Sequence, residues 1–469
     1  MSNTVKKAGD SLVQSRSECL RQIDFDHIWH PFTQSSQWFA DCPLIVDRAE
    51  GFYLYDPEGK DYLDGVSSLW CNVHGHSHPA FTKAGKDQVE NLVHSTMLGL
   101  SHSPIIECTE RLVSLLPAHL SRVFYSDSGT SAVEAAIRIS LEWWQKQGGE
   151  KGRQKTKLLS LAGAYHGDTL GAVGIGFLDF FHGALNKSVV QSHRVRTPHI
   201  FRFEQGCSES EALEKSVSEL KEFLSQEGDS IAAFFVEPLV QGAAGIWVYP
   251  PEYLKEIETL CRKHDIHLII DEVATGFGKT GQIFAHQIAG VEADLLVMGK
   301  GLSGGLLAIS AVACREEIFR GFHGKPSEGK TFFYGQTFAG NPLAARFAEV
   351  NLSLFQDPTL MDGARKRIDK YTGLLDRKLK TLEWVDEVRQ LGFMTGIELT
   401  SKPGSRAAWK SDQQVGVKIV KAARDRGVFI RPLGNVIVLM PAIAMPEEDL
   451  EKLVQVTAEA IDEACSSES

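Results

Sequence analysis

The chain has 469 residues and a formal net charge of −11, and 43% of its residues are hydrophobic. This length is enough for two or three lobes, and the composition is typical of a soluble enzyme. The acidic balance argues against a nucleic acid or an anionic membrane as a partner. No apolar run approaches the roughly 18 residues that are needed to span a bilayer.

The thiols and the N-terminal sequence indicate the cellular compartment. The eight cysteines are scattered and none forms a CxxC pair, so we expect reduced thiols in a cytoplasmic protein. The first residues lack the basic segment, apolar core and cleavage site of a secretory signal. We expect residues 1–22 to be an N-terminal extension, which is either mobile or a helix that docks elsewhere.

Residues 23–70 are predicted to be an N-terminal segment that packs with a small C-terminal domain. Apolar and aromatic runs near residues 43–64 are typical of a strand, a turn and a second strand.

Three histidines alternate in the next stretch, His-Gly-His-Ser-His-Pro, at His74, His76 and His78. This spacing suggests a metal site. However, the stretch from His74 to Pro79 contains no acidic or thiol ligand, and metal sites in proteins usually combine such ligands with histidine. We therefore predict a polar loop and no metal.

Residues 71–345 alternate short apolar runs with helical stretches. This pattern predicts a large α/β domain built on a mainly parallel sheet that is covered on both faces. Five runs end directly in a polar segment, and they span residues 123–125, 158–161, 231–236, 266–270 and 295–298. In open α/β sheets ligands bind at the carboxyl ends of the strands, so we expect the five polar segments to meet in one crevice.

A turn rich in serine and glycine follows the first of these strands, in Ser126-Asp-Ser-Gly-Thr-Ser. A helix is predicted over residues 131–145, with Ser131 and Glu134 at the spacing of a capping box. The start of a helix presents free N–H groups and the positive end of its dipole, which favour an anion. The predicted ligands of a cofactor phosphate are Ser128, Gly129 and Thr130.

Asp271 and Lys300 are the most informative pair, because each directly follows an apolar strand. Burial makes an uncompensated charge on Asp271 costly, so this carboxylate needs a cationic partner. Lys300 lies between two glycines that allow close backbone approach, and burial makes its amine easier to deprotonate. A lysine that forms a Schiff base and a carboxylate that keeps a ring nitrogen protonated are what pyridoxal phosphate requires. The pair therefore predicts a site for this cofactor, against the alternatives of a solvated lysine and a structural acid.

Two further motifs follow predicted strands. Tyr165-His-Gly-Asp offers an aromatic face to the cofactor ring, although packing is the commoner role of such a residue. Phe277-Gly-Lys-Thr-Gly resembles a P-loop, but a P-loop requires glycine where this chain has Val273. We therefore exclude a nucleotide triphosphatase.

Residues 346–469 predict a smaller α+β domain. Its strands are expected near residues 388–392, 393–399, 428–432 and 436–440, followed by a helix over residues 446–465. Helical stretches precede and separate these strands, which distinguishes this part from the alternating pattern before it.

These motifs resemble those of the class III, ornithine-type, pyridoxal-phosphate aminotransferases. The resemblance extends over about residues 26–463 and is carried by Asp271-Glu-Val-Ala-Thr-Gly-Phe-Gly-Lys-Thr-Gly, Lys300, Tyr165-His-Gly-Asp and Gly340-Asn-Pro. Four other segments resemble the branch of that class that converts 8-amino-7-oxononanoate to 7,8-diaminononanoate in biotin synthesis. They are Ile28-Trp-His-Pro-Phe-Thr-Gln, Asp64-Gly-Val-Ser-Ser-Leu-Trp, Asp127-Ser-Gly-Thr and Ile430-Arg-Pro-Leu-Gly.

The resemblance implies the fold type I of pyridoxal-phosphate enzymes and a homodimer with both active sites at the subunit interface. Lys300 would carry the cofactor and shuttle a proton, Asp271 would pair with the ring nitrogen, and Tyr165 would stack on the ring. Glu237 would be a buried acid behind the cofactor. The implied phosphate ligands are Gly129 and Thr130, joined from the other subunit by Gln336 and Thr337. The implied substrate contacts are Phe32, Leu69, Trp70, Tyr165, Lys300, Gly335 and Arg431, of which Arg431 would bind the substrate carboxylate through its planar, charged fork.

The chain departs from this branch at three aromatic positions, which leaves the amino donor open. Phe32 replaces a tyrosine, Leu69 replaces the first tryptophan of a pair, and Val438 replaces an aromatic residue. Aromatic faces favour the sulfonium cation of S-adenosylmethionine. S-adenosylmethionine is nevertheless the first choice because most of the branch uses it, and lysine is the alternative.

Two other functions fit parts of the sequence. One is an ω-amino-acid aminotransferase or an aminomutase of the same class. The other is a binding protein without activity, which would be expected to lack Lys300 or Asp271, whereas this chain has both.

Overall fold

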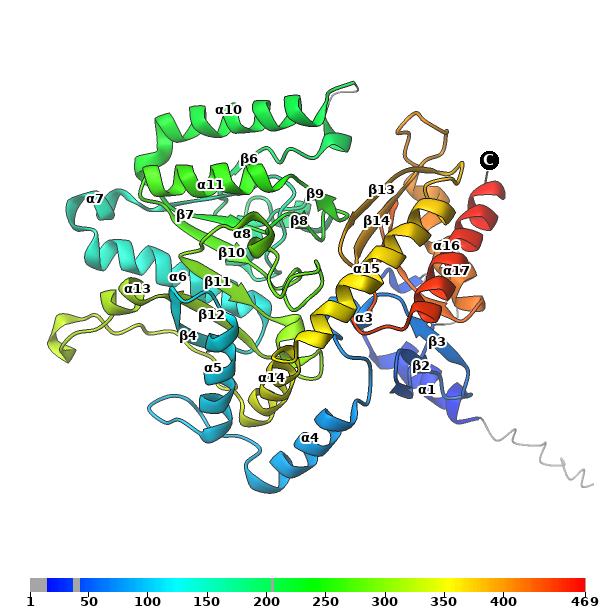
Figure 1. The fold of residues 1–469 in the computed structure, drawn as a ribbon, viewed down its shortest axis with the longest axis horizontal. Coiled ribbons are helices and arrows are strands. Elements are labelled where there is room, and N and C mark those ends of the chain that lie inside the picture. Colours follow the sequence, from blue (N-terminus) through cyan, green and yellow to red (C-terminus); the bar gives the residue numbers. More distant parts are fainter. Residues whose placement is uncertain (1–14, 37–42, 204–205, 469) are drawn as a thin grey trace, which may run out of the picture.

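A seven-stranded sheet organises the larger part of the computed structural model, which describes residues 15–36, 43–203 and 206–468 (Figure 1). Its strand order is β4-β12-β11-β10-β7-β5-β6, and β12 runs antiparallel to both of its neighbours. The strands are β4 (Leu120–Ser126), β5 (Lys157–Leu161), β6 (His193–Val195), β7 (Ile231–Val236), β10 (His267–Asp271), β11 (Leu295–Met298) and β12 (Ser310–Arg315). The prediction of an α/β protein with a mainly parallel sheet is confirmed.

The central strands are apolar throughout because both of their faces are covered. In β7, Ala233 and Phe235 pack into a cluster with residues of α6 (Gly129–Gln147). Phe234 and Val236, which alternate with them, pack into the larger cluster on the other face. A strand buried on both faces reads as a continuous hydrophobic run, as this one does.

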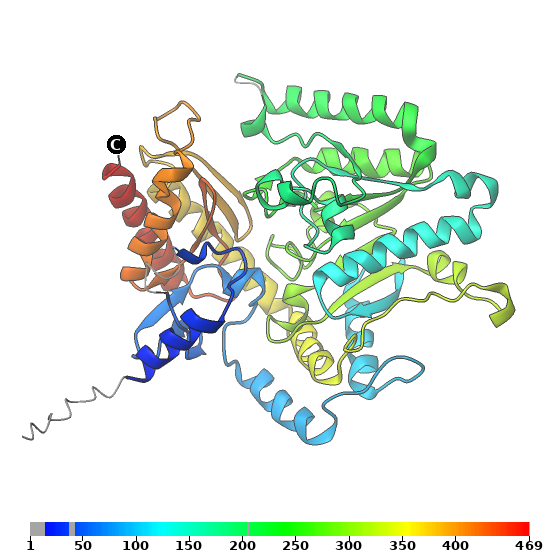
Figure 2. The ribbon, with the colours of Figure 1, turned by 180° about the vertical axis from the view of Figure 1, so that it is seen from behind.

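Helices lie on both sides of the sheet (Figures 1 and 2). Beside α6 are α7 (Gly149–Gln154), α8 (Leu170–Ile175) and α13 (Glu316–Gly321). The other hydrophobic cluster contains residues of α5 (Ser103–Leu115), α10 (Glu209–Glu227), α11 (Pro251–Lys263) and α14 (Pro342–Phe355). Shorter or outlying helices are α3 (Ser67–Trp70), α4 (Pro79–Asn91), α9 (Asp179–His182) and α12 (His286–Ala289).

The start of α6 differs from the prediction. The helix begins at Gly129, and Ser128 is its N-cap, with the Ser128 hydroxyl accepting from the Ser131 N–H at 3.2 Å. The predicted capping box of Ser131 and Glu134 is therefore wrong. Because the helix starts two residues earlier, Glu134 lies beyond the first turn and instead accepts from the Thr169 hydroxyl at the start of α8.

A second, antiparallel sheet has the order β13-β14-β17-β16 and lies beside three helices. Its strands are β13 (Val385–Leu391), β14 (Met394–Leu399), β16 (Arg431–Leu433) and β17 (Val436–Leu439). The helices are α15 (Pro358–Lys378), α16 (Val415–Asp425) and α17 (Glu447–Ser466). The strands β13, β14 and β17 and the last helix occur where the sequence predicts them. The predicted segment 428–432 is divided between two sheets, because residues 428–429 pair with the N-terminal strands and Arg431–Leu433 forms β16.

The N-terminal strands pair with this C-terminal part of the chain. The strands β1 (Arg48–Glu50), β2 (Tyr53–Tyr55) and β3 (Asp61–Asp64) form an antiparallel unit, and β3 pairs in parallel with β15 (Val428–Phe429). Figure 2 shows the blue N-terminal strands beside the orange and red helices. The domain boundaries at residues 22, 70 and 345 stay predictions.

The first described helix, α1 (Arg16–His27), forms two ion pairs with the segments that flank the N-terminal strands. Arg16 pairs with Asp47 at 2.6 Å and Arg21 with Glu58 at 3.1 Å. The described end of the predicted extension is thus helical, and residues 1–14 lie outside the described residues.

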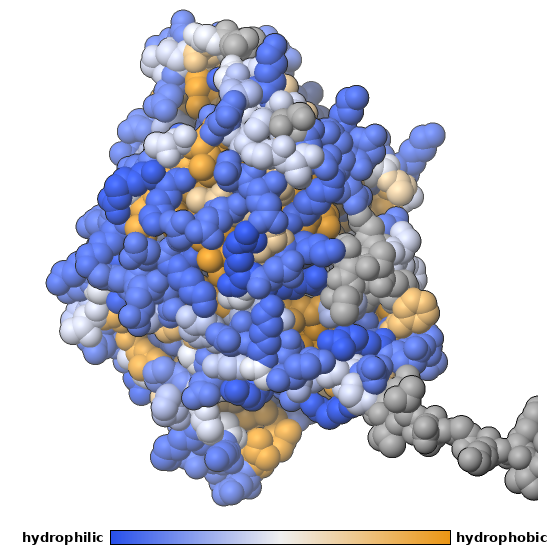
Figure 3. Space-filling view, turned by 90° about the vertical axis from the view of Figure 1, so that its right-hand side faces the viewer, coloured by the Kyte–Doolittle hydropathy of each residue, from blue (hydrophilic) through white to orange (hydrophobic). Residues whose placement is uncertain are grey.

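The surface in Figure 3 is mostly hydrophilic, with small separate hydrophobic spots. Scattered apolar groups of this kind are normal on a solvated surface. Within the described residues, no helix combines the length and the apolar composition that crossing a membrane would require.

Candidate active site

Asp271 and Lys300 lie together at the carboxyl ends of two adjacent parallel strands. The register of β10 and β11 places Asp271 opposite Val297, shortly before Lys300. Burial lowers the pKa of Lys300, and the negative charges of Asp271 and Glu237 oppose that shift without cancelling it. The structure therefore brings the two predicted residues together, and the Lys300 amine loses its proton more easily than a solvated lysine does.

His166 fixes the carboxylate of Asp271 from behind. The Nδ1 atom of His166 lies 2.7 Å from Oδ2 of Asp271, and the Val273 N–H donates to Oδ1 at 3.0 Å. Burial of the ring alone would lower the pKa of His166, but the hydrogen bond and charge of Asp271 outweigh burial and raise it. Asp271 is thus held as an oriented hydrogen-bond acceptor that can serve a further donor.

Glu237 is a buried acid at the end of β7, next to this pair. Its two oxygens accept from the Tyr165 N–H at 3.0 Å and the Gly242 N–H at 2.8 Å. Burial raises the pKa of Glu237 to about 7. The side chain therefore connects the loops after β5 and β7, and its charge changes near neutral pH.

The loop before α6 packs closely against the Lys300 strand. A Cβ atom on Gly129 would lie 2.8 Å from Cγ1 of Val273, and one on Gly299 would lie 3.3 Å from the Cα of Gly129. Gly167, which has a φ of 122°, approaches Thr130 so closely that a side chain would overlap the Thr130 hydroxyl. The first N–H groups of α6 therefore lie beside Lys300, where a helix start favours a phosphate.

Tyr165 lies at the same edge of the sheet, after β5. Its hydroxyl donates to Asp168 at 2.7 Å, and its ring stacks on His182 with the ring centres 6.1 Å apart. Burial raises the pKa of the Tyr165 hydroxyl, so the group remains protonated at neutral pH. Its stacking on a cofactor stays a prediction.

The turn that carries Leu69 and Trp70 has an unusual backbone. Ser67, Ser68, Leu69 and Trp70 have φ values of 50°, 48°, 72° and 69°, all in the left-handed region. Such residues cost roughly 1–2 kcal/mol each, so four of them store on the order of 4–8 kcal/mol. The turn places the Trp70 ring centre 4.8 Å from Nζ of Lys300. Strain of this size persists only where surrounding contacts impose it.

Arg431 belongs to β16, opposite Val438 of β17. Its side chain is half-buried, and burial lowers the pKa of its guanidinium. Within the described part of the chain, no acidic side chain forms an ion pair with it. A partly buried guanidinium without a carboxylate partner is suited to bind the carboxylate of a ligand.

Phe32 lies on the surface near the Tyr165 loop. It is 62% exposed and packs edge-to-face on Phe181, with the ring centres 5.3 Å apart. Phe181 precedes His182, on which Tyr165 stacks. Phe32 is thus connected to the site through aromatic contacts.

The segment with Gly335, Gln336 and Thr337 runs past the start of α6. The Tyr334 hydroxyl donates to the Ser131 carbonyl at 3.1 Å. Gly335 and Thr337 are exposed, and Oε1 of Gln336 is buried without a hydrogen bond among the described residues. Their contribution to the site of another subunit stays a prediction.

The three alternating histidines have three different partners. His74 bonds to Asn351 at 2.9 Å, His76 bonds to Asp64 at 3.1 Å, and His78 caps α4. Among the residues that the structure describes, no group of three or more His, Cys, Asp or Glu side chains could hold a metal ion.

Sequence reasoning missed three residues of the site: Asp64, His166 and Lys279. Each was within a quoted motif, but none was given a role. The partners of His166 and Lys279 are distant in the sequence, with His166 separated from Asp271 by 105 positions and Lys279 from Ser67 by 212. Asp64 instead bonds within its own segment, to Ser68 and His76. The available signal was a polar residue in an otherwise buried segment, which requires a partner.

Comparison with known proteins identifies the family. A family model described as "Aminotransferase class-III" matches residues 35–461. The chain belongs to the class III aminotransferases. The resemblance drawn from the motifs is therefore confirmed, and the protein is a transaminase.

Relatives and solved structures agree with this assignment. The chain is 41% identical to the adenosylmethionine-8-amino-7-oxononanoate aminotransferase of Nitratidesulfovibrio vulgaris, over 95% of this chain and 82% of the relative. The crystal structure of the same-named enzyme from Methanocaldococcus jannaschii superposes with a TM-score of 0.89 and 34% identity, over 95% and 99% of the two chains. An ω-transaminase from Pseudomonas jessenii, solved in complex with PMP, has a TM-score of 0.89 and 29% identity, over 96% and 98%. The likeness confirms the predicted fold class.

Proposed function

We propose that this aminotransferase transfers the amino group of S-adenosylmethionine to the 7-keto group of 8-amino-7-oxononanoate, which yields 7,8-diaminononanoate for biotin synthesis. The observation that carries the proposal is the convergence of Lys300, Asp271 and the start of α6 at one edge of the sheet. The names of the relatives supply the choice of substrates.

The residues present fit pyridoxal 5'-phosphate. The start of α6, where Gly129 lets the backbone approach closely, offers free N–H groups to a phosphate. Lys300 has a buried amine that makes no hydrogen bond or ion pair among the described residues. When bound, pyridoxal phosphate supplies an aldehyde that takes up an amino group and a ring that withdraws electrons. Ser128, Gly129 and Thr130 would hold its phosphate, and Asp271 its ring nitrogen.

Each residue has a distinct task in the reaction. Lys300 would hold the cofactor, and its amine, whose pKa is lowered by burial, can accept and return a proton as a general base and acid. Asp271 would pair with the ring nitrogen, and His166 holds Asp271 in place. Tyr165 would stack on the ring, and Glu237 fixes the Tyr165 backbone.

The substrates are bound on the side of Trp70 and Arg431. Arg431 binds the carboxylate of 8-amino-7-oxononanoate, and Leu69, Trp70, Phe32 and Gly335 form walls around the chain of the substrate. Trp70 is 8% exposed, so its ring also excludes water from the Lys300 amine.

The amino donor decides between two versions of this function. The purified protein is given S-adenosylmethionine or lysine separately, with 8-amino-7-oxononanoate, and diaminononanoate is measured. We expect product with S-adenosylmethionine. If product forms only with lysine, lysine is the amino donor. If no product forms with either compound, the assignment is refuted.

An ω-amino-acid aminotransferase is the second candidate, because an ω-transaminase has a closely similar structure. Growth of a biotin auxotroph that lacks its own diaminononanoate synthase separates the two. Rescue by this chain supports the biotin step, whereas activity on ω-amino acids without rescue supports the second candidate.

We further propose a cytoplasmic homodimer with shared active sites, in which Gln336 and Thr337 reach the phosphate of the partner. Large apolar side chains are exposed around this segment, among them Phe333 and Phe338. A second copy would cover them. The cysteines that the structure describes are free thiols, in line with the cytoplasm. Sedimentation equilibrium tests the dimer, and a monomeric holoenzyme with full activity would contradict it.

A further inference from the structure

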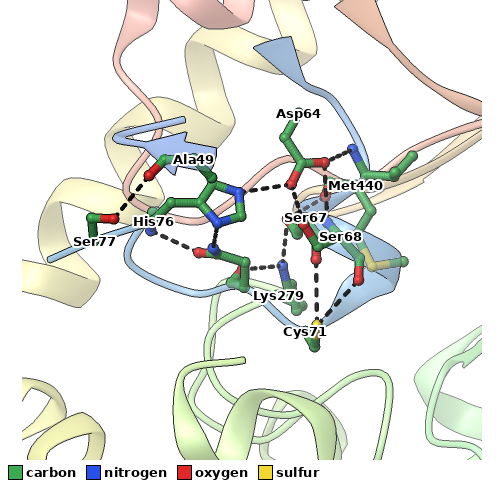
Figure 4. A network of polar contacts seen from close by, with 12 residues as sticks. Ala49, Asp64, Ser67, Ser68, Cys71, His76, Ser77, Lys279 and Met440 are labelled. Carbon is green, nitrogen blue, oxygen red and sulfur yellow. Dashed lines mark hydrogen bonds and ion pairs between the residues drawn. The ribbon is translucent and has the colours of Figure 1, made fainter. Parts of the chain in front are cut away.

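Asp64 holds the strained turn of Ser67–Trp70 from outside the substrate site (Figure 4). Its carboxylate is 3% exposed and accepts from the Ser68 N–H at 3.0 Å and the Ser68 hydroxyl at 2.7 Å. It also accepts from the Val66 N–H at 3.3 Å and from Nε2 of His76 at 3.1 Å. One buried carboxylate therefore satisfies four donors, two of which belong to Ser68.

The neighbours of His76 determine which of its two ring nitrogens carries the proton. The Gly75 N–H donates to Oδ1 of Asn72 at 2.7 Å, so the Asn72 amide nitrogen faces His76. That nitrogen donates to Nδ1 of His76 at 3.2 Å, which assigns the remaining proton to Nε2. Nε2 then donates to Asp64, so the side chain at position 64 must offer a hydrogen-bond acceptor to His76 and not a donor.

Lys279 holds the same turn from the opposite side. Its ammonium donates to the Ser67 hydroxyl at 3.1 Å and to the Asn72 carbonyl at 3.2 Å, and the Ser67 hydroxyl donates to the Met440 carbonyl at 2.6 Å. The turn is thus fixed at Ser67 and at Ser68, immediately before Leu69 and Trp70.

The position of the Trp70 ring depends on this backbone. The ring is close to Nζ of Lys300, and a Cβ atom on Gly242 would lie 3.1 Å from it. Negative φ values are lower in energy for residues other than glycine. The turn therefore relaxes if the hydrogen bonds at Ser67 and Ser68 are removed. Such a relaxation would move the indole away from the Lys300 amine.

We propose that Asp64 is a positioning residue for the reaction: its carboxylate locks the left-handed turn, and the turn keeps Trp70 over Lys300 and Leu69 in the substrate wall. Asp64 acts through Ser68 and touches neither cofactor nor substrate. The kinetic part of this inference depends on the proposed function, whereas its structural part does not.

Asp64→Asn is the test, because it preserves shape and replaces one acceptor oxygen with a donor that faces the His76 proton. Asp56→Asn is the matched control. Asp56 organises another turn of the same strands by accepting from the Glu58 N–H at 3.1 Å and the Lys60 N–H at 2.9 Å. Both variants remove a carboxylate from a turn, but only one of these turns leads to Trp70.

The first readout is the accessibility of the Lys300 amine, which requires no substrate. The full-length protein freed of cofactor is treated briefly with formaldehyde and cyanoborohydride, and methylation at Lys300 is followed by mass spectrometry. We expect labelling to accelerate roughly threefold to tenfold in Asp64→Asn, the change in local opening when one hydrogen bond is lost. Asp56→Asn should label at the wild-type rate.

The second readout is the steady-state kinetics of the holoenzyme. A displaced Leu69 and Trp70 raise KM for the acceptor, whereas general destabilisation lowers only the active fraction and hence kcat. We expect KM to rise in Asp64→Asn and to be unchanged in Asp56→Asn.

Two further variants keep the test decisive. If Asp64→Asn fails to fold, Ser68→Ala removes a single hydroxyl contact and should accelerate Lys300 labelling about twofold. In the Asp64→Asn background, Leu69→Gly relieves left-handed strain and should slow labelling again. Wild-type labelling and wild-type KM in folded Asp64→Asn would overturn the proposal. Increased labelling of Lys300 in Asp64→Asn, in a protein that catalyses no transamination, would support the role of Asp64 and would refute the proposed function.

Discussion

Replacement of Arg431 by alanine isolates the recognition of the substrate carboxylate. The guanidinium is half-buried, and among the described residues no acidic group offsets its charge. A hydrogen bond to a charged group contributes about 1.5–3 kcal/mol. Loss of about 2–3 kcal/mol lowers kcat/KM by roughly 30- to 150-fold, since 1.36 kcal/mol corresponds to a factor of ten.

The assay compares 8-amino-7-oxononanoate with its methyl ester, which has the same chain and no negative charge. We expect the loss in Arg431→Ala to be confined to the acid. Arg431→Lys keeps the charge without the planar fork and should give an intermediate loss. Equal losses for acid and ester would refute the assigned role, because they would indicate a general distortion of the site.

Three further outcomes follow from the geometry. Asp271→Asn should lower the single-turnover rate constant on the order of 100-fold, because the ring nitrogen loses its charged partner. A decrease of less than about threefold would contradict this. Glu237 has a pKa raised to about 7, so the free energy of unfolding of the wild type should fall, relative to Glu237→Gln, as pH rises from about 4.5 to 7. Urea titrations at several pH values test this, and a parallel pH dependence would disprove it. Gly129→Ala adds a methyl group 2.8 Å from Val273 and should weaken cofactor binding in equilibrium dialysis; Val273→Ala should restore it, and no rescue would argue against the close packing.

The residues at strand ends were predictable from the sequence because local pattern determines them. Asp271 and Lys300 each follow a short apolar run, and parallel strands bring their carboxyl ends together. The sequence could not predict that His166 bonds to Asp271, since that contact depends on the order of the strands in the sheet.

The left-handed turn could not be predicted, for a different reason. Ser67, Ser68, Leu69 and Trp70 have no preference for positive φ. The hydrogen bonds of Ser67 with the distant Lys279 and Met440, together with those of Ser68 to the Asp64 carboxylate, impose that conformation. The error at the start of α6 arose because Ser128 and Ser131 both match the N-cap pattern. The local sequence pattern predicted a helix in the correct segment but placed its start two residues too late.

The measurement that tests the central claim most directly is borohydride reduction of the purified holoenzyme, followed by peptide mass spectrometry. Reduction fixes a bound pyridoxal phosphate to the lysine that carries it. We expect the added mass on the peptide that contains Lys300. Added mass on another lysine, such as the buried Lys279, would contradict the assignment of Lys300 as the lysine that carries the cofactor. A yellow protein in which no peptide gains mass would contradict it as well.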